Sequence, residues 1–153
     1  MRPKSASLCF LLGFAALGLA AGRQAGPDRP HSVGGGDNMT SPSDRLVVVW
    51  SSGDREVALK MAFMYTLNAK RNDWWPDVTL VVWGPSANLL SGDSELQEQV
   101  KAMKEAGVRL EACKACSDLY GVSEKLQSLG VDVKYMGQPL TAYLMEGRRV
   151  ITF

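Results

Sequence analysis

The stretch Arg45-Leu46-Val47-Val48-Val49-Trp50 decides the fold that this sequence predicts. It is a continuous apolar run rich in β-branched residues, which is typical of a strand buried on both faces. Ser51-Ser52-Gly53-Asp54 follows with turn and N-cap residues, and a helix is expected from there to about residue 70. The apolar face of that helix is expected to include Val57, Met61 and Met64.

The same strand-then-helix unit recurs along the chain. Further strands are predicted over 78–83, 108–112, 131–135 and 149–153, and helices over 86–90, 94–106, 116–129 (interrupted at Gly121) and 140–145. This alternation predicts an α/β fold, a three-layer α/β/α sandwich with a mainly parallel sheet of about five strands. Binding and catalytic sites of such sheets lie at the carboxyl ends of the strands. That rim is expected to collect Trp50, Trp83, Cys113 and Tyr135.

The amino-terminal part of the sequence has the pattern of an export signal. Arg2 and Lys4 precede an apolar run over 8–21 that ends in small residues, which predicts a signal peptide over 1–21. An uncleaved membrane anchor is the alternative, although a span needs about 20 apolar residues. Residues 22–44 are rich in Gly, Pro, Ser and Asp and predict a flexible linker, which leaves 45–153 as the folded domain. The expected location is therefore outside the cytoplasm, periplasmic or secreted.

Cleavage would change both the charge and the cysteine content of the chain. It removes two of the 17 basic residues and none of the 16 acidic ones, so the net charge falls from +1 to about −1. A nearly neutral domain offers no basic surface for nucleic acid, and none is expected as a partner. Cys9 leaves with the signal, so Cys113 and Cys116 are the cysteines that remain.

These two cysteines are the strongest chemical signal in the sequence. Cys113 is expected where the third strand ends and a helix begins, and the helix N-terminus together with Lys114 would stabilise a thiolate there. Cys113 is therefore a candidate nucleophilic or sulfur-carrying thiol, the alternative being a small buried apolar residue. Cys116 could serve as a resolving thiol, a disulfide partner or a metal ligand.

Other kinds of site find less support in the sequence. Structural zinc sites need four ligands, and the chain after cleavage offers two cysteines and His31, which lies in the predicted linker, so no metal is expected. The absence of a glycine-rich phosphate loop argues against a nucleotide, and no cofactor is predicted. A thioredoxin fold is disfavoured because the pair follows the third strand and Pro139 precedes a helix rather than a strand.

Two segments carry a resemblance to a known family. They are Ala112-Cys113-Lys114-Ala115-Cys116 through Gly121-Val122, and Val133-Lys134-Tyr135-Met136-Gly137-Gln138-Pro139-Leu140-Thr141; the closing Val150-Ile151-Thr152-Phe153 also fits. Over 45–153 the chain resembles the DsrE family of sulfur-relay proteins. The resemblance implies an α/β/α sandwich, assembly into oligomers, and persulfide carriage on the cysteine that matches Cys113, eight residues before Gly121.

The sequence departs from the better-known family members in two respects. Cys116 is an addition relative to the relay subunits, and those subunits are cytoplasmic, whereas this chain carries a predicted signal peptide.

The resemblance and the cysteine pair together lead to one main hypothesis. We expect a DsrE-like sulfur carrier or sulfurtransferase-like protein that accepts persulfide sulfur on Cys113, with Cys116 as the second thiol; whether it is an enzyme stays open. The expected partners are further copies of the chain and a sulfur donor or acceptor protein, with a membrane only if the signal is retained. The alternatives are a non-catalytic oligomeric module with a structural or buried cysteine pair, and a thiol–disulfide exchange protein.

Overall fold

The computed structural model describes residues 41–153. The predicted signal peptide and residues 22–40 of the predicted linker lie outside the described residues. A single turn, η1 (Pro42–Asp44), precedes the first strand. Five parallel strands then form one sheet in the order β4-β3-β2-β1-β5. They are β1 (Arg45–Trp50), β2 (Asp77–Val82), β3 (Arg109–Cys113), β4 (Asp132–Lys134) and β5 (Arg149–Thr152).

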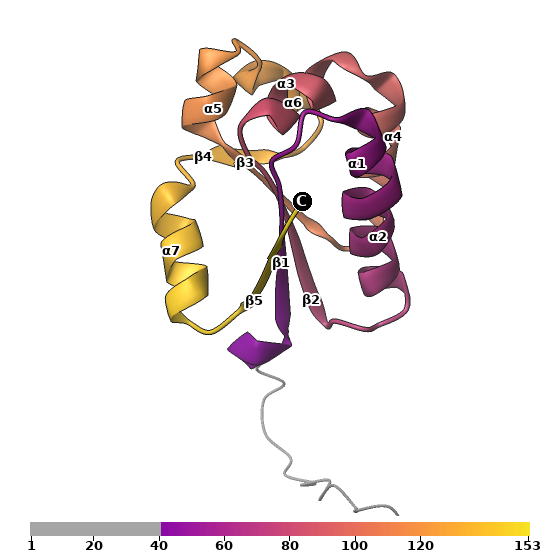
Figure 1. Cartoon of the computed structure of the whole chain (residues 1–153), viewed down its shortest axis with the longest axis vertical. Coiled ribbons are helices and arrows are strands. Elements are labelled where there is room, and N and C mark those ends of the chain that lie inside the picture. Colours follow the sequence, from indigo (N-terminus) through magenta and orange to yellow (C-terminus); the bar gives the residue numbers. More distant parts are fainter. Residues whose placement is uncertain (1–40) are drawn as a thin grey trace, which may run out of the picture. The chain divides into compact units, whose positions relative to one another are not determined.

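Helices cover both faces of this sheet, unequally. The helical segments after η1 are α1 (Arg55–Val57), η2 (Ala58–Phe63), α2 (Met64–Arg71), α3 (Pro85–Gly92), α4 (Ser94–Glu105), α5 (Lys114–Leu119), α6 (Ser123–Ser128) and α7 (Gly137–Met145). Figure 1 shows α7 on one side of the sheet and α1, α2 and α4 on the other. The predicted α/β/α sandwich with a parallel sheet is confirmed.

The side chains of each strand alternate between the two faces, because successive residues of a strand point in opposite directions. In β1, Leu46, Val48 and Trp50 enter the larger core, whereas Val47 and Val49 enter a smaller cluster beneath α7. All five are buried. A strand with both faces buried reads as an unbroken apolar run, which is why this stretch predicted the fold.

The helix after β1 begins as predicted but presents a different face to the core. The Asp54 carboxylate accepts hydrogen bonds from the backbone N–H groups of Glu56 and Val57, so it caps α1. Met61 and Met64, which were expected to face inward, are 49% and 56% exposed. The buried face runs through Ala58, Ala62, Thr66 and Ala69 instead, so the helical period was predicted correctly but the face was placed one residue too early.

The predicted helix over 116–129 is two short helices in the structure. α5 ends at Leu119, and Gly121 adopts a left-handed conformation with φ 68° before α6 begins. Glycine tolerates positive φ without a steric penalty, so it can turn the chain there. The interruption expected at Gly121 is therefore present.

Candidate functional site

The two candidate cysteines lie together at the carboxyl end of β3. Cys113 is the last residue of the strand and Cys116 lies in the first turn of α5. Both are free thiols. Cys116 packs against the small apolar cluster that contains Cys113. The two differ in burial, since Cys113 is 4% exposed whereas Cys116 is half-buried.

Apolar side chains surround the pair on the α7 side of the sheet. Cys113 is a member of the smaller cluster, together with Val47, Val49, Val81 and Met136. Cys116 is among the partly buried residues that pack against this cluster, with Trp83, Leu140, Tyr143 and Val150. Because Met136 and Leu140 belong to the start of α7, the thiols lie between the edge of the sheet and that helix.

The surroundings of Cys116 favour the neutral thiol over the thiolate. Burial raises the pKa of Cys116, and its hydrogen bond with Cys113 raises it further. A hydrogen bond from the backbone of Gly84 acts in the opposite direction, because a donor stabilises the thiolate. Gly84 connects β2 to α3 with φ 71°, so a left-handed residue of the neighbouring strand end supplies this contact.

The helix N-terminus and Lys114, which were expected to stabilise a thiolate at Cys113, are arranged differently from that expectation in the structure. Cys113 is the N-cap residue of α5, but its side chain makes no capping hydrogen bond, and α5 has only 6 residues. Lys114 donates to the carboxylate of Asp118 at 2.5 Å, and its ammonium lies 5.8 Å from the centre of the Tyr135 ring. Most of the Lys114 charge is therefore directed away from the sulfur atoms.

A buried ionic cluster that the sequence analysis missed lies next to Cys113. Glu111 is 5% exposed and shares the face of β3 with Cys113, two residues away. Its carboxylate accepts hydrogen bonds from the Tyr143 hydroxyl, at 2.9 and 3.0 Å, and from the Lys134 ammonium, at 2.9 Å. Lys134 also donates to Asp132 at 2.7 Å. A glutamate between Leu110 and Ala112, inside a predicted strand, was the signal available in the sequence.

This cluster ties α7 to the strand that carries Cys113. Tyr143 belongs to α7, Glu111 to β3 and Lys134 to β4. The guanidinium of Arg148 lies 4.0 Å from the centre of the Tyr143 ring, a cation–π contact on the same side chain. Burial raises the pKa of Tyr143, and the hydrogen bond to Glu111 raises it further. For Lys134, burial lowers the pKa, but the bonds to Asp132 and Glu111 outweigh it and leave the pKa raised.

The other residues expected on the rim do not all reach it. Trp50 is fully buried in the larger core, with its ring 4.7 Å from that of Phe63 in an edge-to-face contact, so it does not face the thiols. Trp83 does pack against the cluster that holds Cys113, and Tyr135 is 67% exposed. The strand ends therefore bring Trp83 and the cysteines together and leave Trp50 inside.

Residues 41–153 contain no group of three or more His, Cys, Asp or Glu side chains able to hold a metal ion. None of the helices in this part of the chain has the length and apolar character needed to cross a membrane.

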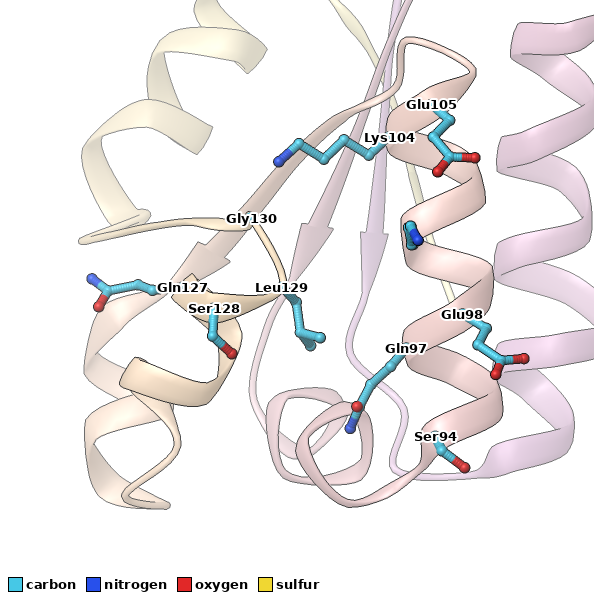
Figure 2. A pocket seen from close by; sticks show the side chains of 10 residues that line it. Ser94, Gln97, Glu98, Lys104, Glu105, Gln127, Ser128, Leu129 and Gly130 are labelled. Atoms are coloured by element: carbon cyan, nitrogen blue, oxygen red, sulfur yellow. The ribbon is translucent and has the colours of Figure 1, made fainter.

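A cavity of about 650 Å³ lies elsewhere, between α4 and the end of α6 (Figure 2). Most of the residues that line it are polar, and their charges are mixed: Ser94, Gln97, Glu98, Lys101, Lys104, Glu105, Gln127, Ser128, Leu129 and Gly130. Lys104 extends toward Gly130, which has no side chain to obstruct it (Figure 2). Neither cysteine contributes to this cavity, so it is separate from the thiol pair.

Comparisons with known proteins agree with this architecture. The model of the DsrE/DsrF-like family matches residues 44–153. The structure of BT1422, a conserved protein of unknown function from Bacteroides thetaiotaomicron, is 34% identical with a TM-score of 0.72, and the match covers 76% of this chain and 100% of that one. The ychN protein of E. coli is 17% identical with a TM-score of 0.58, covering 71% and 98%, and shows the fold alone. No curated protein matches the chain. The chain belongs to the DsrE/DsrF-like family.

Proposed function

We propose that this protein carries sulfane sulfur as a persulfide on Cys113, with Cys116 as the second thiol. The observation that carries the proposal is the placement of two free thiols in one small apolar cluster at the carboxyl end of β3, in a domain of a family linked to sulfur relay. The carboxyl edge is where parallel sheets of this type place their reactive groups. An apolar cluster around Cys113 would also shield a persulfide from water and from competing thiols.

The direct test is to incubate the reduced protein with a persulfide donor and to locate added sulfur by mass spectrometry of its peptides. In wild type, we expect one added sulfur atom on the peptide that contains Cys113. The corresponding peptide of the Cys113→Ser variant should gain none. Reaction of Cys113 with iodoacetamide in a separate sample without donor shows that the thiol is reduced and reachable. A reduced, reachable Cys113 that never gains sulfur would exclude the proposal.

Thiol–disulfide exchange is the second candidate, and the same placement favours it. Two free cysteines three residues apart that pack in one cluster are placed to form a disulfide. The measurement is the reduction potential of the pair in glutathione buffers. A potential between about −120 and −270 mV, the range of thiol oxidoreductases, would support exchange, and one below about −300 mV would indicate a structural disulfide.

The location and assembly of the protein are proposals as well. The amino-terminal sequence supports export, so this chemistry would take place in a periplasmic or extracellular compartment. Amino-terminal sequencing of the protein from its own cells tests this, since export predicts a chain that begins near residue 22. Leu144 and Met145 on α7 are 57% and 83% exposed, which is consistent with contact between copies of the chain. Light scattering of the purified protein tests that expectation.

A further inference from the structure

The two thiols differ in how easily a reactant can reach them. Cys113 is 4% exposed and has Met136, at the start of α7, in the same buried cluster. Cys116 is half-buried and lies in the short helix α5 at the rim of the sheet. Cys116 is therefore the more accessible of the two residues, whereas contact with Cys113 requires part of its covering to move.

The covering of Cys113 is held in place by specific bonds. Tyr143 of α7 donates to both carboxylate oxygens of Glu111, at 2.9 and 3.0 Å, and Glu111 also pairs with Lys134. Because Glu111 and Cys113 belong to the same strand, moving α7 away from Cys113 would break the contacts with Tyr143. Direct access to Cys113 therefore needs a local opening that costs free energy.

We propose that Cys116 receives sulfur from the donor and passes it to Cys113, an inference that rests on the proposed function. In the first step, the Cys116 sulfur attacks the outer sulfur of a donor persulfide, R–S–SH, and gives Cys116–S–SH and R–SH. In the second step, the Cys113 sulfur attacks the outer sulfur of Cys116–S–SH, the old S–S bond breaks, and the products are Cys113–S–SH and the Cys116 thiol. One S–S bond forms and one breaks in each step, so no external oxidant or reductant is needed.

The packing of the two side chains provides the path for the second step. Cys116 packs against the small buried cluster that contains Cys113, and the two are three residues apart across the junction of β3 and α5, so the sulfur atoms can approach each other. The departing Cys116 sulfur takes up the proton that Cys113 gives up and leaves as a neutral thiol. The same two steps in reverse would return sulfur from the buried Cys113 to an acceptor at the surface.

The test follows sulfur on each cysteine over time with glutathione persulfide as the donor. Wild type, Cys116→Ser and Cys113→Ser are compared, and Leu119→Ser serves as control because that side chain is 88% exposed on the same helix α5. In wild type and control, we expect sulfur on Cys116 first and on Cys113 later. Cys113→Ser should keep its sulfur on Cys116, and Cys116→Ser should load Cys113 more slowly by a factor of about ten or more.

The outcomes separate this inference from the function on which it rests. If Cys116→Ser loads Cys113 at the wild-type rate, or if Cys113→Ser gains no sulfur on Cys116, the transfer between the thiols is wrong while carriage on Cys113 stands. If wild type gains no sulfur on either cysteine, the proposed function itself fails. Circular dichroism of each variant shows whether its domain is folded when the rates are compared.

Discussion

Replacing Tyr143 by phenylalanine tests whether α7 is held over Cys113 by the buried ionic cluster. The change removes one hydroxyl and keeps the ring, so Arg148 can still stack on it. Without the Tyr143 hydroxyl, Oε2 of Glu111 loses its hydrogen bond, whereas Oε1 keeps the hydrogen bond from the Lys134 ammonium at 2.9 Å. A hydrogen bond to a charged group contributes about 1.5–3 kcal/mol, and Tyr143 is half-buried, so we expect a loss of about 2 kcal/mol in the free energy of unfolding.

The assay is urea unfolding of wild type, Tyr143→Phe and the matched control Tyr120→Phe. Tyr120 is 44% exposed, and its hydroxyl has no hydrogen-bond partner in the described domain, so its loss should leave the free energy of unfolding unchanged. A loss of about 2 kcal/mol corresponds to a fall of roughly 10 °C in Tm for a domain of this size. If Tyr143→Phe unfolds within about 0.5 kcal/mol of wild type, the cluster does not hold α7 and this reasoning is refuted.

Three further changes have defined outcomes. Gly84→Ala should lower the free energy of unfolding by about 1–3 kcal/mol, because Gly84 has φ 71°, a backbone conformation that strains alanine. Gly92→Ala, at a helical position with open space around it, should leave the free energy of unfolding unchanged. Equal urea midpoints for the two variants would contradict this expectation. The rate at which iodoacetamide alkylates Cys116 should still rise with pH above about 8.5, because the thiolate is the reactive form and its pKa is raised; a plateau below that pH would be inconsistent. The free energy of unfolding should fall above about pH 10, because the pKa values of Tyr143 and Lys134 are raised and the folded state therefore holds these protons more tightly than the unfolded chain does. The fall should be smaller in Tyr143→Phe. An identical pH profile for both proteins would count against this assignment.

The layout of the sheet could be predicted because it depends on local patterns. The apolar run Arg45–Trp50 is buried on both faces, and a capped helix follows it, so sequence alone indicates a parallel strand with its crossover. The direction of the helix face could not be predicted in the same way. The buried face consists largely of small side chains, Ala58, Ala62 and Ala69, so a pattern that follows the larger apolar residues placed Met61 and Met64 inside.

The candidate site was predictable only in part, because its surroundings come from distant segments. The spacing of Cys113 and Cys116 indicated that the thiols could meet, and the structure packs Cys116 against the cluster that contains Cys113. The cluster around Glu111 joins residues 23 and 32 positions apart, so no local pattern reveals it. The burial of Cys113 likewise depends on how α7 packs, which the strand's own sequence does not contain.

The measurement that tests the central claim most directly is the location of sulfur on the protein isolated from its own compartment. Peptide mass spectrometry after rapid alkylation distinguishes a thiol, a persulfide and a disulfide at Cys113 and Cys116. The proposed function predicts a fraction of molecules with one added sulfur atom on Cys113, which increases after exposure to a persulfide donor and disappears on reduction. A pair found only as an unreactive disulfide or as unmodified thiols, with or without the donor, would contradict it.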